Sequence, residues 1–165
     1  MFGSSAAVLV VELAALRLLA PYLGLTLETN TLVIGTALTA IALGAWFGGR
    51  SADLVLPRRA IAPLLSGAGA AVAVTPFAVR GAGELGEAGL LLIVAGMTIV
   101  IPGALLSAVK PMVNKLMLTT LAETGTVVGR LSGIATAGAI FGTVVTGFVL
   151  ISRVPVTGIM VGLGL

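Results

Sequence analysis

The sequence predicts an all-α integral membrane protein with five membrane-spanning helices and a partial sixth. Hydrophobic residues make up 58% of the 165 residues, charged residues only 9%, and the mean hydropathy is +1.21. A soluble domain carries about a quarter charged residues, so this chain has too little charge to cover a surface exposed to water. Its apolar residues also fall into stretches of about 20, which is the length that spans a bilayer as a helix.

Residues 31–49 form the helix around which we arrange the others. This stretch has no charged side chain, and as a helix it is about 28 Å long, close to the thickness of the hydrocarbon core. Gly48 and Gly49 end it, and Arg50, Arg58 and Arg59 follow. We therefore predict a short basic turn between the second and third helices.

The other spans follow from apolar stretches on either side of this helix. The first helix is interpreted as retained and not as a signal peptide, because no basic segment precedes it and Glu12 and Arg17 interrupt it. Pro102-Gly103 interrupts the fourth helix and predicts a kink in its backbone. The last segment is about 18 Å long as a helix, so we expect either a sixth helix that is cut short or one that enters the bilayer partway. The predicted helices are residues 4–23, 31–49, 60–79, 88–109, 127–152 and, in part, 154–165, with an amphipathic interfacial segment at 110–126.

The basic residues predict the orientation of the chain. Arg80 and Arg153 fall in loops on one side, Arg17 lies within the first helix, and six of the nine basic residues fall on the other side. Cytoplasmic loops are enriched in Lys and Arg, so we expect a multi-pass protein of the plasma (inner) membrane with its N-terminus in the cytoplasm. The six are Arg50, Arg58, Arg59, Lys110, Lys115 and Arg130.

Several classes of function are disfavoured by the composition. The chain has no cysteine and no histidine, which removes thiolate nucleophiles, histidine bases and most zinc or haem ligation. We predict no catalytic residue, no cofactor and no metal site, and we attribute the net charge of +3 to membrane orientation and not to nucleic acid. Residues 81–86 match G-x-G-x-x-G, but without a preceding strand we interpret them as a hairpin loop.

Glu12 and Arg17 are candidate substrate-binding residues in the first helix. An ionisable group at a helix centre costs about 2.5–3.5 kcal/mol on insertion scales, so Glu12 needs an interior location and a partner. Five residues of about 100° each place Arg17 about 140° away, on a different face. Glu12 either binds a cation or proton, or ties the first helix to a neighbour; Arg17 either binds substrate or extends its guanidinium to the membrane surface.

Lys110 and Asn114 are the second pair of candidates, because their spacing of four places them on one helical face. They mark either the cytoplasmic mouth of a cavity or ordinary positive-inside anchoring. Small residues spaced four apart predict close helix packing, with a discontinuous helix as the alternative. The packing candidates are Gly44, Gly48, Gly129, Gly133, Gly138 and Gly142.

The chain resembles the membrane domain of the fused MFS/spermidine synthase-like proteins, in which a transporter-like helical region precedes a soluble synthase domain. The turn between the second and third helices is also similar to the major facilitator signature, with Gly49 and Asp53 in place and the basic pair Arg58-Arg59 about one residue late. The matching stretches are VELAALRLLAPYLG (11–24), ALGAWFGGRSAD (42–53), IPGALLSAVKPMVNK (101–115) and VGRLSGIATAGAIFGTVVTGFVLI (128–151).

The resemblance implies half of a major facilitator fold and a polyamine-linked function. No residue of this chain matches the synthase domain, so aminopropyl transfer is not implied. One half cannot enclose a two-sided pathway, so we expect a homo-oligomer or a partner membrane chain within the lipid bilayer. The leading hypothesis is a module that binds or moves a small cationic metabolite such as a polyamine. The alternative is a scaffold that anchors a separate synthase-like domain or another enzyme.

Overall fold

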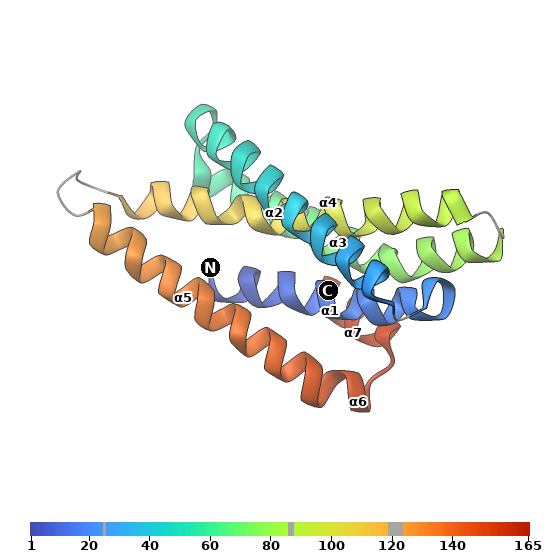
Figure 1. Cartoon of the computed structure of the whole chain (residues 1–165). Helices are drawn as coiled ribbons and strands as arrows, with labels where there is room; N and C mark the ends of the chain where they lie inside the picture. The colour runs from blue at the N-terminus through green and yellow to red at the C-terminus, as the bar shows by residue number, and fades with distance from the viewer. Residues whose placement is uncertain (25, 86–87, 119–123) are drawn as a thin grey trace.

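The computed structural model describes residues 1–24, 26–85, 88–118 and 124–165, and every regular element within them is helical (Figure 1). Five long helices are followed by a widened turn, one further short turn and a shorter final helix. The elements are α1 (Phe2–Leu23), α2 (Leu27–Leu54), α3 (Pro57–Glu84), α4 (Ala88–Met117), α5 (Thr124–Val145), η2 (Thr146–Leu150), α6 (Ile151–Arg153) and α7 (Val156–Gly164).

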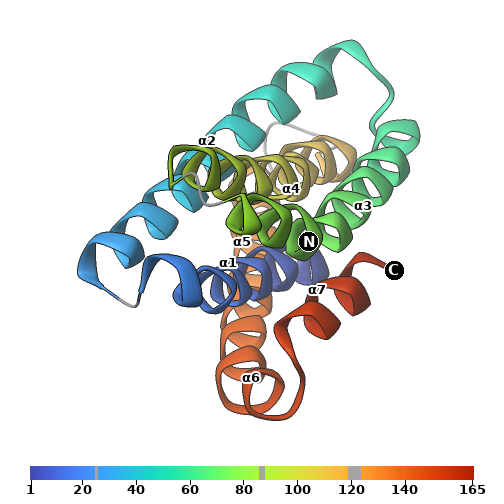
Figure 2. The same ribbon diagram turned by 90° about the vertical axis from the view of Figure 1, so that its right-hand side faces the viewer.

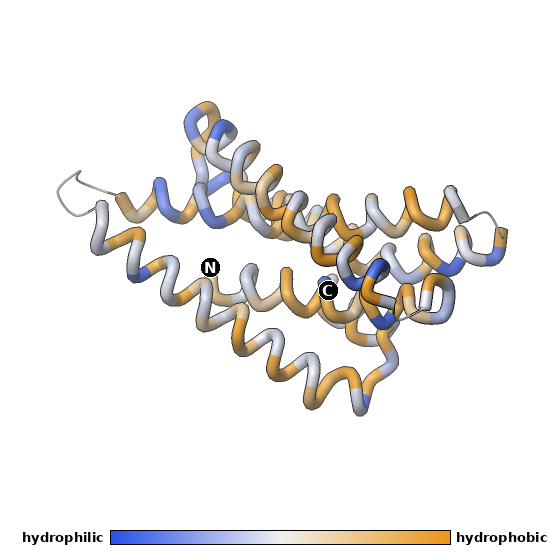
Figure 3. The backbone as a smooth tube through the Cα atoms, viewed as in Figure 1, coloured by the Kyte–Doolittle hydropathy of each residue, from blue (hydrophilic) through white to orange (hydrophobic). Residues whose placement is uncertain are grey.

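Five helices are long and apolar enough to cross a membrane, which confirms the predicted fold class of five spans and a shorter sixth helix. Each of the five has at least 22 residues, so each exceeds the length that a bilayer requires. Figure 3 shows hydrophilic positions gathered toward the ends of these helices, with hydrophobic and neutral positions between them. The chain is therefore built as a multi-pass membrane protein.

The predicted basic turn is shorter than expected, because α2 continues through Gly49, Arg50 and Asp53 to Leu54. Thr26 caps the start of this helix by accepting a hydrogen bond from the Thr29 amide at 3.2 Å. Residues 55–56 connect it to α3, which begins with Pro57 at a position where a missing amide hydrogen has no cost. Arg58 and Arg59 thus belong to the first turn of α3.

The hairpin loop predicted at residues 81–86 is also largely helical. The α3 helix contains Pro63 and Pro76 in its interior and continues to Glu84, so Gly81 and Gly83 are helical residues. Gly86 lies outside the described residues. Because the helix continues through these glycines, their backbone amides stay hydrogen-bonded close to the membrane surface. Glycine alone therefore does not end this span.

The predicted interruption at Pro102-Gly103 does not break the fourth helix, because α4 is continuous through Pro102 and Pro111. Neighbouring helices make proline tolerable inside a span, and Pro102 is completely buried in this one. The interfacial segment predicted at 110–126 is wrong wherever the structure describes it. Its first part, 110–117, extends α4, and residues 124–126 begin α5, while 119–123 lie outside the described residues.

The C-terminal third bends twice. After Val145 the helix widens into η2, where the Ile151 amide donates to the Thr146 carbonyl oxygen five residues earlier. The chain then leaves α6 at Val154, and α7 turns back against α3. A Cβ added to Gly69 would lie 2.6 Å from the Gly164 carbonyl oxygen, so the two backbones nearly touch there. Figure 2 shows α7 on the same side of the bundle as α3, with α4 between α2 and α3.

Two seams of small residues hold the long helices together. A Cβ at Gly48 would lie 2.6 Å from Ala108 Cα, and Gly44 meets Ala104 one turn earlier, so α2 and α4 run in the same direction. The α1–α5 seam is equivalent: Gly138 meets Phe2 and Gly142 meets Ala6. Such residues let helix backbones approach closely in lipid.

Gly129 and Gly133 do not share this role, although the four-residue spacing predicted it. No atom lies within 4 Å of a Cβ built at either position, and both residues are exposed. The first turns of α5 diverge from the rest of the bundle, so these glycines precede the point at which α5 meets α1 (Figure 1). Spacing identified the seam but not where it begins.

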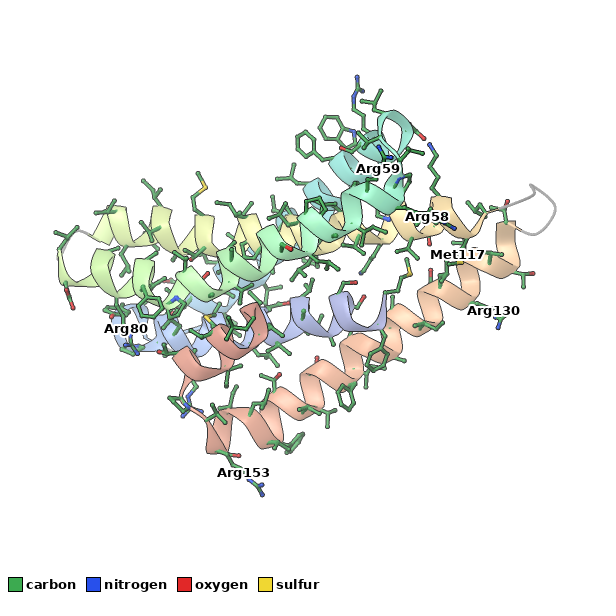
Figure 4. All side chains as sticks on the ribbon, turned by 180° about the vertical axis from the view of Figure 1, so that it is seen from behind. Arg58, Arg59, Arg80, Met117, Arg130 and Arg153 are labelled. Atoms are coloured by element: carbon green, nitrogen blue, oxygen red, sulfur yellow. The ribbon has the colours of Figure 1, made fainter. Side chains whose placement is uncertain are left out.

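Basic residues gather at opposite ends of the bundle as the sequence predicts. Figure 4 shows Arg58, Arg59 and Arg130 at one end with Met117, and Arg80 and Arg153 at the other end. The arrangement follows from five spans that alternate in direction.

Candidate functional site

A polar cleft of about 260 Å³ opens between α4 and α5, beside the start of α1. Lys110 and Asn114 line it from α4, so the structure confirms that these two predicted residues share one face. Ser132 and Thr136 line it from α5, again four residues apart. Met1, Ala135 and Ala139 complete the described lining. We call this the α4–α5 cleft.

The polar groups of the cleft are not paired with one another. Asn114 Oδ1 is buried and accepts no hydrogen bond within the described part of the chain. The Lys110 ammonium likewise forms no ion pair with a described residue, and none of the described acidic residues lines the cleft. A partly buried ammonium without a counter-ion is costly in a span, so the cleft has an uncompensated positive charge.

Arg17 lies at the other end of the molecule, in a second cleft of about 220 Å³ that Arg80, Tyr22 and Val156 help to line. Its Nη1 donates to the Ile151 carbonyl oxygen at 2.9 Å. Arg80 Nη2 donates to Thr157 Oγ1 at 2.7 Å. These two arginines tie α1 and α3 to the C-terminal turns, which is a structural role for Arg17.

Glu12 lies near the middle of α1 and lines neither cleft. It is partly buried, and it makes no hydrogen bond or ion pair with any described residue. The four predicted substrate-binding residues therefore do not form one site. Lys110 and Asn114 come together, Arg17 lies at the opposite end, and Glu12 stands apart as an unpaired carboxylate within a span.

Asp53 has a partner that the sequence did not reveal. Lys115 Nζ donates to Asp53 Oδ1 and to the Ala52 carbonyl oxygen, both at 2.8 Å. This pair joins the end of α2 to α4, next to the point where Gly49 approaches Pro111. Arg58 and Arg59 are exposed and do not take part. In the turn that resembles the major facilitator signature, Asp53 thus links the end of α2 to α4.

Sequence reasoning missed Ser132, Thr136 and Arg80. A signal for the first two existed in their four-residue spacing on one face, which is the same argument that identified Lys110 and Asn114. It was hidden because the neighbouring glycines suggested packing. Three more buried hydroxyls without a partner in the described chain were also missed: Ser5, Ser107 and Thr146.

The described residues contain no group of three His, Cys, Asp or Glu side chains that could hold a metal ion. Carboxylates and imidazoles are the usual ligands, and the clefts present amide, hydroxyl and cationic groups instead. Comparison of the chain with protein-family models, with curated proteins and with solved structures finds no match. The function is therefore inferred from the residues of the clefts and from Glu12.

Proposed function

We propose that this chain is a transporter-like membrane module that binds or moves a small cationic metabolite such as a polyamine. Glu12 is the observation that carries the proposal. It lies ten residues beyond Phe2, at the start of α1, which is about 15 Å along the helix. An acidic group at such a depth costs about 2.5–3.5 kcal/mol on insertion scales, and no described residue compensates for it.

A bound cation would supply that compensation. An ammonium group forms a charge-assisted hydrogen bond with a carboxylate, and a partly dry location strengthens it. The sequence resemblance to the fused MFS/spermidine synthase-like proteins supports a polyamine as the cation, and the five spans with a shorter sixth helix support half of a major facilitator fold. A half of this kind needs a second copy or a partner chain to enclose a pathway.

Spermidine binding tests the proposal. Wild-type protein in detergent should bind spermidine, and Glu12→Gln should bind it about tenfold more weakly or worse, because the substitution removes the charge but keeps the shape. Glu28→Gln is the matched control, since Glu28 is exposed at the start of α2. Equal spermidine binding by wild type and Glu12→Gln would contradict the cation site.

A second candidate function is a membrane scaffold that anchors a soluble synthase or another enzyme. The observation that favours it is an exposed basic surface at one end, formed by Arg50, Arg58, Arg59 and Arg130. Co-purification of a soluble partner from native membranes, lost in the Arg58→Glu/Arg59→Glu double variant and with no flux in proteoliposomes, would favour the scaffold. Spermidine flux that depends on Glu12 would favour transport.

The grouping of basic residues supports an inner-membrane location with the N-terminus in the cytoplasm. The chain lacks cysteine, so single cysteines report the orientation directly. In intact cells a membrane-impermeant maleimide should label Arg153→Cys and should not label Arg58→Cys until the cells are opened. The reverse pattern would invert the orientation, and labelling of both would contradict the spans.

A further inference from the structure

The α4–α5 cleft is lined by hydrogen-bond donors. The Lys110 ammonium has three donors, the Asn114 amide has two, and the hydroxyls of Ser132 and Thr136 have one each. Among the residues that the structure describes, no carboxylate lines the cleft, so its electrostatic character is opposite to that of Glu12. Such a set is suited to an anion with several oxygens, since each oxygen can accept from a different side chain.

The depth of the cleft distinguishes a solute from a lipid. Lys110 precedes Met117, at the end of α4, by seven residues, or about 10 Å of helix. Nearer that end lies a mainly apolar cleft of about 290 Å³, which is lined by Met117 of α4 and by Val127, Arg130, Leu131 and Ile134 of α5. A bound lipid places its headgroup outside its acyl chains, whereas here the polar cleft is the inner one. The order favours a free solute.

We propose that the α4–α5 cleft binds a phosphate group, carried by inorganic phosphate or by a small phosphate-bearing solute. Lys110 offsets one negative charge of the anion, and the amide and hydroxyl groups donate to its oxygens. This site is separate from Glu12, so it stands or falls independently of the cation proposal.

Calorimetric titration of the purified chain with inorganic phosphate, in an uncharged detergent, tests the site. Wild type should bind phosphate, and Lys110→Met should bind it about tenfold more weakly or worse. Lys115→Met is the matched control: it removes the same charge from the same helix, outside the cleft. It should retain wild-type affinity.

Two further variants separate recognition from folding. Thr136→Val and Asn114→Leu keep the side-chain shape but remove a donor and an amide, respectively, and each should weaken phosphate binding by about fivefold. The cleft variants should elute as wild type does in gel filtration, because the side chains of Lys110, Asn114 and Thr136 are not paired with other described groups. Retained phosphate affinity in Lys110→Met, or equal losses in Lys110→Met and Lys115→Met, would overturn the proposal.

Nanodiscs distinguish a lipid headgroup from a free phosphate. A free-phosphate site should bind phosphate equally in discs of phosphatidylcholine and in discs that contain phosphatidylglycerol. Two results together would assign the same site to an anionic headgroup. Wild type would lose phosphate binding in phosphatidylglycerol discs, and Lys110→Met would release bound phosphatidylglycerol. No phosphate binding by wild type in detergent or in phosphatidylcholine discs, with no phosphatidylglycerol retained through Lys110, would overturn the site for both sources.

Discussion

The two sides of α4 differ in how they meet their neighbours. On the side of α2, Gly44 and Gly48 bring the backbones together at Ala104 and Ala108, so that no side chain separates them. On the side of α5, Lys110 and its neighbours leave a cleft of about 260 Å³. A single helix thus forms a closed seam and an open polar surface, less than one turn apart.

This difference shows how residue size replaces hydrophobic force in a membrane. Lipid is as apolar as the side chains, so helices associate through close packing and hydrogen bonds. Glycine and alanine provide that packing against α2. Where polar side chains occupy the other face, the helices stay apart, and the space becomes available to a ligand. Four variants, one of them a double substitution, test this comparison.

Gly48→Leu should have the largest effect. A Cβ at this position would lie 2.6 Å from Ala108 Cα, and the clash is with backbone that cannot move aside. Overpacking of this kind should lower the free energy of unfolding by about 3 kcal/mol or more. Gly35→Leu on the same helix, where nothing lies within 4 Å, is the control and should unfold as wild type does. Thermal unfolding in detergent compares the two.

A disulfide across the seam should form almost completely. A Cβ at Gly49 would lie 4.0 Å from Pro111 Cβ, within the range of a disulfide at about 3.5–4.5 Å. Gly49→Cys/Pro111→Cys should therefore form a disulfide within one chain. When that chain is cut between α2 and α4, its two fragments should stay joined until the disulfide is reduced. Separate fragments under oxidising conditions would show that the seam opens.

Ser107→Ala should have a moderate and favourable effect. The Ser107 hydroxyl is completely buried, one turn before Lys110, and has no partner in the described chain. Its removal relieves an unpaired polar group and should raise the free energy of unfolding by about 1 kcal/mol. Ser152→Ala is the comparison, because that hydroxyl already donates to the Phe148 carbonyl oxygen. A loss of stability in Ser107→Ala would mean that the hydroxyl has a bound partner.

Asp53→Ala should have the smallest effect. Asp53 is 77% exposed and Lys115 44% exposed, so water screens their ion pair. We expect a loss of about 0.5 kcal/mol or less, and Lys115 keeps the Ala52 carbonyl oxygen as a partner. A loss larger than the estimated effect of Gly48→Leu would show that charge, and not backbone packing, closes the seam.

The number of spans could be predicted because hydropathy is local. The second, third and fourth spans end later than predicted, since Arg50, Asp53 and Lys110 belong to α2 and α4. A polypeptide near lipid keeps its amides hydrogen-bonded, and long side chains reach water from within the helix. The helix therefore continues for a turn or more beyond its predicted end, as α2 and α4 do.

The candidate site could be predicted only in part. Helical spacing alone placed Lys110 and Asn114 together and separated Glu12 from Arg17. The contribution of α5 could not be inferred, because it depends on where α5 leaves α1, and no local pattern encodes that point. The pairing of Arg17 with Ile151 depends on residues 134 positions apart, which spacing along one helix cannot show.

The widened turn η2 has a consequence for the end of the chain. A turn that closes over five residues holds one more residue than an α-helical turn, and so rotates everything after it by about 100° relative to a regular helix. That rotation determines which way the Ile151 carbonyl faces and where residues 154–155, which connect α6 to α7, begin. Removing one residue between 146 and 150 would restore a regular helix and swing the final segment away from α3, detaching the last turns without changing a residue of the α4–α5 cleft.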